Sequence, residues 1–284
     1  MVAALALLSS FVLASATILI RLGLRGGGPY TGYWINLVVG VVGIWLVVAL
    51  TGGASEVTAA GVGYFVLAGL VGTVAGRLLR FFAIEAVGAS VTAALMNLTP
   101  LVSSALAFLL LGERVTVPVV LGILVLVVGT TLVSAGGQRV GVRPGQLLLP
   151  VLSAACLGLV AVIRKVGLTD TGPVVGFAVN VTTALVAFTG FLLVSGQREA
   201  MACRGRHLAI FVAAGIAENL SVLLVVVALS MGTVSVVAPL ASVSPIFVLA
   251  LSLVFLRDIE ALNGRIVLGT FLTVAGAGLI TALR

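Results

Sequence analysis

Two arginines and one glutamate are the residues in this sequence best suited to do chemistry. Arg77 and Arg80 are spaced i, i+3, which places both side chains on one face of a helix. Two guanidinium groups on one face can bind a carboxylate or a phosphate bidentately. If the helix ends at Gly76 instead, both side chains can extend to the lipid headgroups. The pair therefore predicts either an anion site or an interfacial anchor.

Glu218 is the acid that lies deepest within an apolar segment. A low-dielectric environment favours the neutral form of a carboxyl group, which suits a proton-coupling site. The alternative is a buried ion pair with Arg77 or Arg80 that only holds the helices together. Asn219 follows Glu218 directly, and we expect its side chain to line the same cavity.

Two prolines interrupt apolar segments at corresponding places. Pro100 and Pro245 each remove a backbone N–H, and a kink at each would open space between helices. Asn97 and Ser242 precede them by about one turn, so we expect their side chains to face that space. The alternative is that the kinks only improve packing.

Two aromatic residues complete the candidates. Trp34 lies near a helix start, where an aromatic belt is expected, and Tyr64 lies within an apolar segment. Either ring can line a cavity instead of anchoring the protein in its membrane. The predicted substrate-binding residues are Arg77, Arg80, Asn97, Glu218, Asn219, Ser242, Tyr64 and Trp34, with Pro100 and Pro245 as helix kinks.

The sequence does not predict a catalytic residue, a metal site or a cofactor. Cys156 and Cys203 are too isolated for a metal site, and His207 is the single histidine. A membrane-embedded lipid-modifying enzyme needs paired acids or a catalytic histidine, and the apolar segments carry neither. A P-loop is also missing, so ATP hydrolysis is not indicated. We therefore expect a protein that is not an enzyme.

The composition predicts that these residues lie in a membrane protein. Of 284 residues, 61% are hydrophobic and 8% are charged, and the mean hydropathy is +1.36. A soluble domain carries about a quarter charged residues, so this chain is expected to be a multi-pass protein of the cell membrane. The net charge of +7 comes from scattered basic residues rather than a stripe. They favour anionic lipids, not nucleic acid, as partners.

Apolar runs of about 20 residues predict an all-α architecture. One long interval, 219–256, is divided at Met231-Gly232-Thr233, and its first part begins at 208. Ten transmembrane helices result, at about 2–22, 30–51, 63–86, 89–111, 116–135, 145–166, 173–195, 208–231, 234–256 and 266–283.

An internal duplication organises these helices. Residues 83–113 align without a gap over 228–258, with Pro100 over Pro245. Upstream, Pro29 and Asn36 have counterparts in Pro173 and Asn180. We therefore predict two repeats, 1–140 and 141–284, with five helices each. Because five is odd, the second repeat must enter the membrane from the opposite side, an arrangement typical of secondary transporters.

The repeated segments also resemble a known family. The first reads ASVTAALMNLTPLVSSALAFLLLGERVT and the second VSVVAPLASVSPIFVLALSLVFLRDIE, each followed by a helix with spaced glycines. This pattern is similar to the EamA domain of the drug/metabolite transporter superfamily, over nearly the whole chain. Asn36 and Asn180 stand where members often carry an arginine. The resemblance implies a transporter with both termini in the cytoplasm, whereas the distribution of basic residues favours both termini outside.

Together these features predict a secondary transporter that works by alternating access. The substrate would be a small metabolite, an amino-acid-like compound or a drug, moved by proton coupling or exchange. The alternatives are a lipid flippase of the same superfamily and, less favoured, a lipid-modifying enzyme. Glycine seams allow close helix contact within one subunit or in a homodimer; they include Gly72 and Gly76, Gly122 and Gly129, and Gly269 and Gly276.

Overall fold

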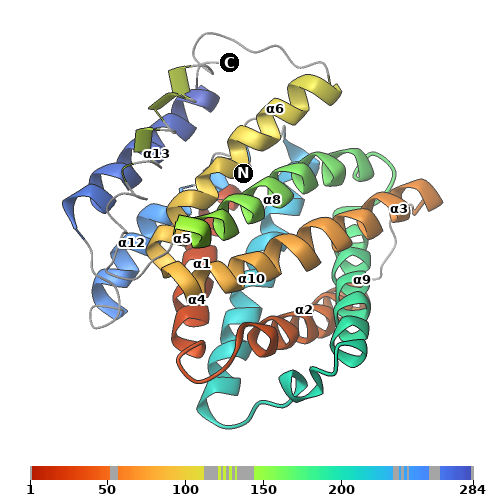
Figure 1. The fold of residues 1–284 in the computed structure, drawn as a ribbon. Coiled ribbons are helices and arrows are strands. Elements are labelled where there is room, and N and C mark those ends of the chain that lie inside the picture. Colours follow the sequence, from red (N-terminus) through yellow and green to blue (C-terminus); the bar gives the residue numbers. More distant parts are fainter. Residues whose placement is uncertain are drawn as a thin grey trace.

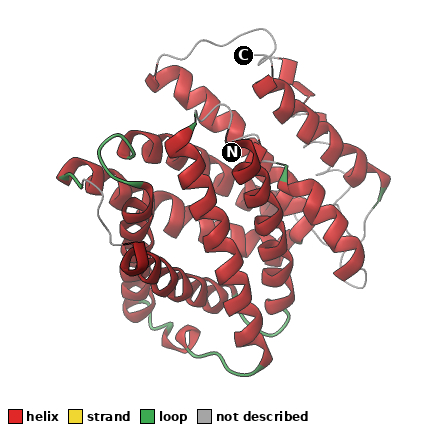
Figure 2. Cartoon of the chain, turned by 180° about the vertical axis from the view of Figure 1, so that it is seen from behind, coloured by secondary structure: helices red, strands yellow, loops and turns green. Residues whose placement is uncertain are grey.

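The computed structural model describes residues 2–51, 57–111, 121–122, 124–125, 128–129, 132, 144–232, 237, 240–241, 243–255 and 263–282. Within these residues the chain is helical, with short connections between the helices (Figures 1 and 2). One isolated β-bridge joins Val57 and Thr171. The expected all-α architecture is confirmed for this part of the chain.

The first half begins with two long helices and continues with a run that changes its helical form. The elements are α1 (Val2–Gly23), α2 (Pro29–Thr51), α3 (Ala59–Ala68), a π-helical segment (Gly69–Gly76), α4 (Arg77–Val87), α5 (Ala89–Leu95), a 3₁₀ turn (Met96–Leu98) and α6 (Thr99–Leu111). From α3 to α4 the run forms one candidate span, Ala59–Val87. Wide π-helical turns are rare and often mark functional positions.

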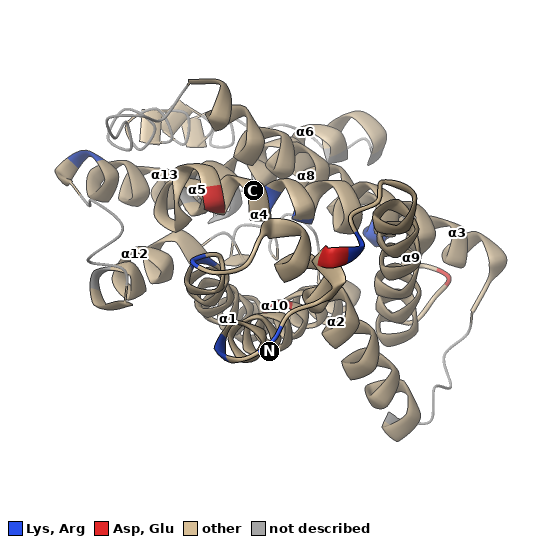
Figure 3. Ribbon diagram, turned by 60° about the horizontal axis from the view of Figure 1, so that its bottom comes forward, with Lys and Arg blue, Asp and Glu red and all other residues tan. Residues whose placement is uncertain are grey.

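The second half contains the corresponding long helices. They are α8 (Leu148–Gly167), α9 (Pro173–Val194), α10 (Arg206–Met231), α12 (Ser244–Phe255) and α13 (Gly264–Ala282), with 3₁₀ turns at Pro144–Leu147 and Arg198–Met201. Charged residues are sparse along the helices of both halves (Figure 3).

Among the described residues, six helical runs are long and apolar enough to cross a membrane: Val2–Gly23, Pro29–Leu50, Ala59–Val87, Pro144–Gly167, Pro173–Val194 and Arg206–Met231. They match six of the predicted spans. The predicted span 116–135 lies mostly outside the described residues, as does the start of 234–256. The number of ten spans therefore stays a prediction.

The two prolines lie at corresponding positions near the start of two α-helices. Pro100 is the second residue of α6, directly after the 3₁₀ turn, and Pro245 is the second residue of α12. Pro100 thus lies within one uninterrupted helical run, Ala89 to Leu111, at the point where a 3₁₀ turn separates two α-helices. The predicted kinks stay predictions.

Glycines let the long helices of the two halves approach closely. A Cβ on Gly32 of α2 would overlap the ring of Phe211 on α10, and one on Gly176 of α9 would overlap the ring of Phe65 on α3. Both rings are buried. Helices α1 and α10 also contact each other along their length, as do α8 and the run from α3 to α4 (Figure 1).

Candidate functional site

A buried ionic network lies where α4 meets α10. Arg80 Nη1 lies 2.5 Å from Glu218 Oε1, and Arg77 Nε lies 3.7 Å from the same oxygen. Arg77, Arg80 and Glu218 are only 3%, 6% and 1% exposed. The helix continues past Gly76 as α4, so the interpretation of the two arginines as headgroup anchors is wrong. The predicted pair of arginines and the predicted acid instead meet inside the helix bundle.

Two asparagines connect these charges to each other. Asn36 Nδ2 on α2 donates to Glu218 Oε2 at 2.8 Å. Arg77 Nη1 donates to Asn36 Oδ1 at 3.3 Å and to Asn219 Oδ1 at 3.2 Å. Asn219 Nδ2 in turn donates to the carbonyl oxygen of Asn36 at 2.9 Å. Buried charges need such partners, because an unsatisfied ionic group is costly away from water.

Helix α1 closes the network on its other side. Arg80 Nη2 donates to Thr17 Oγ1. The first half thus supplies residues from α1, α2 and α4, and the second half supplies Glu218 and Asn219 from α10.

A second polar cluster lies next to this network. Arg164 Nη2 on α8 donates to Asn180 Oδ1 on α9 at 3.1 Å, and Thr73 Oγ1 donates to the same oxygen at 2.8 Å. Tyr33 donates from its hydroxyl group to the carbonyl oxygen of Thr73. Because Thr73 precedes Arg77 by about one turn on the same helical run, the two clusters are contiguous. Arg164 is 8% exposed.

The described polar residues of the two clusters carry more positive than negative charge. They include three arginines, Arg77, Arg80 and Arg164, but one carboxylate, that of Glu218. Arg77 Nη2 and Arg164 Nε are buried without a hydrogen-bond partner among the described residues. Glu218 is closest to Arg80 and also lies 3.7 Å from Arg77, so one carboxylate faces two guanidinium groups, and Arg164 hydrogen-bonds to the neutral side chain of Asn180.

Contacts between the halves occur in reciprocal pairs. When the alignment of the repeats is extended, Asn36 corresponds to Asn180 and Glu218 corresponds to Thr73. Asn36 donates to Glu218, and Thr73 donates to Asn180. Each asparagine on the second helix of one half therefore contacts the third helix of the other half.

Further contacts follow the same rule. Ser221 Oγ donates to the carbonyl oxygen of Ser9, and Ser153 Oγ donates to that of Gly76.

Within each half, the basic group at the end of the first helix binds the end of the third helix. Arg21 Nη1 donates to the carbonyl oxygen of Ile84 at 2.9 Å, and Lys165 Nζ donates to that of Leu229 at 3.1 Å.

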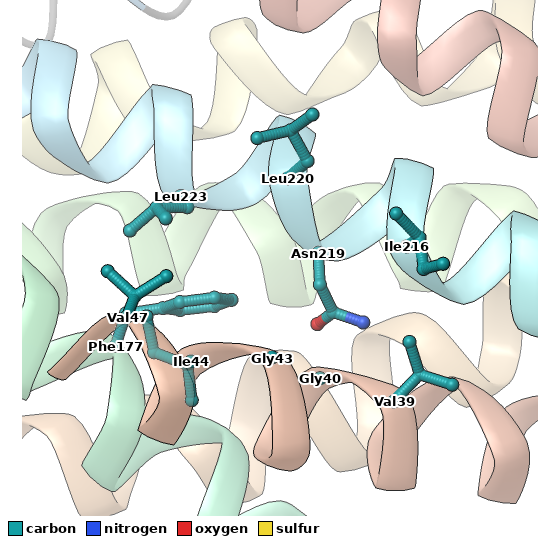
Figure 4. A pocket seen from close by; sticks show the side chains of 10 residues that line it. All are labelled: Val39, Gly40, Gly43, Ile44, Val47, Phe177, Ile216, Asn219, Leu220 and Leu223. Atoms are coloured by element: carbon teal, nitrogen blue, oxygen red, sulfur yellow. The ribbon is translucent and has the colours of Figure 1, made fainter. Parts of the chain in front are cut away.

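An apolar groove of about 240 Å³ adjoins the network between α2 and α10 (Figure 4). Its lining residues are Val39, Gly40, Gly43, Ile44, Val47, Phe177, Ile216, Asn219, Leu220 and Leu223. The polar side chain is that of Asn219, which points from α10 toward α2 and packs on Gly40. Ile216 and Leu220 are exposed, so the groove opens on the outer apolar surface.

The other predicted site residues lie elsewhere. Trp34 Nε1 donates to Thr189 Oγ1 at 3.1 Å, and its ring packs against the aromatic core. Tyr64 on α3 is 39% exposed and is not part of either cluster. Asn97 lies in the 3₁₀ turn before α6, but its side chain is outside the described residues, as is Ser242. The described residues include no group of three potential metal ligands.

Sequence reasoning missed several members of the clusters, namely Thr17, Tyr33, Asn36, Thr73, Arg164 and Asn180. A signal existed for Asn36 and Asn180, because polar residues at matching positions of both repeats fall in the middle of apolar segments. Arg164 was hidden by its neighbour Lys165, since two adjacent basic residues near a helix end are typical of a membrane interface.

Comparisons with known proteins agree with this architecture. A family model described as the EamA-like transporter family matches residues 1–135 and again 144–282. A solved structure described only as "Crystal structure of protein" is 18% identical, covers 99% of this chain and 96% of its own, and superposes with a TM-score of 0.69. That likeness shows a shared fold. Among curated proteins, none matches the chain.

Proposed function

Because the chain belongs to the EamA-like transporter family, we propose that it is a secondary transporter that moves a small molecule by alternating access. It is a multi-pass integral membrane protein of the drug/metabolite transporter superfamily. The proposed substrate site is the buried network around Arg77, Arg80 and Glu218. The observation that carries this proposal is that the ionic contacts of the network join one half of the chain to the other.

The reciprocal contacts support an inverted relation between the halves. A two-fold axis in the membrane plane brings the second helix of each half against the third helix of the other, as Asn36–Glu218 and Asn180–Thr73 do. Transporters built this way bind substrate near the middle of the membrane, between the repeats. Polar residues placed there are expensive and are typically functional.

The Arg80–Glu218 pair suits a switch between two states. Arg80 belongs to the first half and Glu218 to the second, so the halves cannot separate at this level while the pair is intact. Separating a buried pair without new partners costs about 3–5 kcal/mol. A proton on Glu218 would remove its ionic attraction to Arg80, and an anionic substrate group bound by Arg80 would replace the carboxylate as its partner. We propose that Glu218 couples transport in this way.

The test is transport by purified protein in vesicles, with a panel of labelled amino acids, organic anions and cationic drugs. We expect uptake of at least one compound by the unmodified protein. Glu218→Gln removes the carboxylate with little change in size and is expected to lower the initial rate at least tenfold. Glu199→Gln removes an exposed carboxylate in the turn before α10 and should leave the rate unchanged.

The pH dependence of the same assay tests coupling. If Glu218 carries the proton, the rate of the unmodified protein depends on pH and on an imposed pH gradient. Any residual transport by the Glu218→Gln protein should then be insensitive to both. An identical pH profile for the two proteins would show that Glu218 serves only to hold the helices together.

Lipid flipping is the second candidate, and the lateral opening of the groove between α2 and α10 favours it. Vesicles containing a fluorescent phospholipid report the fraction of lipid that a membrane-impermeant quencher can reach. Quenching of half the lipid with and without protein would exclude flipping, whereas further quenching with protein would support it.

A further inference from the structure

We propose that Arg77 and Arg164 together hold an anionic group of the substrate, either a carboxylate or a phosphate. This inference rests on the proposed transport function and deepens it, since it assigns a substrate class to the buried site. It also adds a binding residue, Arg164, that neither the sequence pattern nor the ionic network includes.

The first step is the distribution of partners in the two clusters. The carboxylate of Glu218 is bound most closely by Arg80 Nη1 on one oxygen and by Asn36 Nδ2 on the other. Arg77 therefore makes its hydrogen bonds to the amide oxygens of Asn36 and Asn219. Arg164 makes its hydrogen bond to the amide oxygen of Asn180. These hydrogen bonds of both guanidinium groups thus go to neutral oxygens, and the carboxylate that Arg77 Nε approaches at 3.7 Å is already bound more closely by Arg80.

The second step is what these two side chains still offer. Arg77 Nη2 and Arg164 Nε are buried and have no hydrogen-bond partner among the described residues. A buried cation with an unused donor is unfavourable unless an anion completes it. A carboxylate or phosphate can accept from two guanidinium groups at once, which amide oxygens cannot match in charge.

The third step is that the helix packing shared by the two halves does not require Arg77 or Arg164. The structural role at the end of the first helix falls to Arg21 in one half and to Lys165 in the other. In the same alignment Arg164 corresponds to Ile20, and Arg77 corresponds to Val222. A bundle of this architecture is therefore built without a cation at these two positions in the matching half. Their presence in one half calls for another explanation.

The fourth step is proximity. Arg164 and Thr73 donate to the same oxygen of Asn180, so Arg164 lies beside the helical run that carries Arg77 one turn further on. Helix α8 runs alongside this part of the chain (Figure 1). The two arginines thus approach one region from α8 and from α4, and an anion there would bridge them.

The test is ligand binding by the purified protein in detergent, at constant ionic strength. The probes are succinate and inorganic phosphate, with choline and sorbitol as the cationic and neutral comparisons. We expect at least one anion to raise the melting temperature and to give a saturable binding signal by calorimetry, and neither comparison compound to do so. The stronger of the two anions identifies the bound group as a carboxylate or a phosphate.

Substitutions assign the binding to the two arginines. Arg164→Gln is expected to weaken anion binding at least tenfold, and Arg164→Lys, which keeps the charge, to weaken it less. Arg206→Gln removes an exposed arginine at the start of α10 and should leave binding unchanged. Without anion, the Arg164→Gln protein should melt at the same or a higher temperature than the unmodified protein, because it loses an uncompensated buried charge.

Three results would overturn the inference: no binding of either anion, unchanged binding by the Arg164→Gln protein, or a large loss of its melting temperature without ligand. The third would assign Arg164 a structural role. Transport of a cation or neutral compound in vesicles, combined with no anion binding, would reject the inference while the proposed transport function stands.

Discussion

Asn36 is the residue on which most of the ionic network depends. Its amide group donates to Glu218 and accepts from Arg77, and its carbonyl oxygen accepts from Asn219. An asparagine suits the position because its amide carries both a donor and an acceptor, which a carboxylate or a guanidinium group does not.

We therefore expect Asn36→Ala to lower the free energy of unfolding by about 2–4 kcal/mol, because it removes one hydrogen bond from each of two buried ionic groups, Glu218 and Arg77. Denaturation of the purified protein in detergent, followed by tryptophan fluorescence, measures this difference. Gln197→Ala, which removes an exposed amide before α10, is the matched control and should change stability little. Equal stability of the two variants would show that Asn36 does not hold the network.

At this scale the sequence predicts the central charged residues, and an ion pair of Glu218 with Arg77 or Arg80 as one alternative, but not the asparagine on α2 that connects them. Arg77, Arg80, Glu218 and Asn219 are rare polar groups in apolar segments, so their cost alone marks them. Tyr64 is equally isolated in sequence, yet its ring faces outward, because hydropathy does not report which side of a helix faces the bundle. Arg164 stayed hidden for the opposite reason, since it lies near a helix end and still points inward.

At the scale of elements, the close contact between helices depends on glycines facing aromatic rings. Gly176 on α9 leaves room for the ring of Phe65, whereas Gly190 on the same helix has open space around it. Gly176→Ala is therefore expected to destabilise the protein by about 1–3 kcal/mol through overpacking. Gly190→Ala should be neutral or slightly stabilising, since alanine favours a helix.

The same denaturation assay compares these two variants directly. Combining Gly176→Ala with Phe65→Leu should recover part of the lost stability, because the smaller side chain makes room for the added methyl group. If Gly176→Ala and Gly190→Ala behave alike, the close approach of α9 to α3 does not contribute to stability.

Six of the ten predicted spans could be located from apolar length alone, because a membrane-spanning helix must be long and almost free of charge. The change of helical form before Pro100 could not. An apolar run that contains a proline does not indicate that the α-helix gives way to a 3₁₀ turn over Met96–Leu98. The π-helical segment Gly69–Gly76 also has no periodic signature in the sequence, although it precedes Arg77 directly.

For the whole molecule, the duplication combines a repeated scaffold with charges that are not repeated. The contact of Ser221 with the carbonyl oxygen of Ser9, for example, has its counterpart in the contact of Ser153 with the carbonyl oxygen of Gly76. By contrast, Arg77, Arg80 and Arg164 correspond to apolar residues in the opposite half. Sequence alignment of the halves predicts the scaffold, because it compares matching positions. It does not predict which unmatched charges meet, since that depends on contacts across the two halves.

The central claim is that the halves open alternately around the buried network. Thr73 tests it most directly, because its side chain is fully buried between the two clusters in this state. Thr73→Cys in a Cys156→Ser, Cys203→Ser background would be exposed to a membrane-impermeant thiol reagent in right-side-out and in inside-out vesicles. We predict that the thiol is modified from both sides, at rates that change when a transported substrate is added. Modification from one side only, or protection from both sides under all conditions, would contradict alternating access.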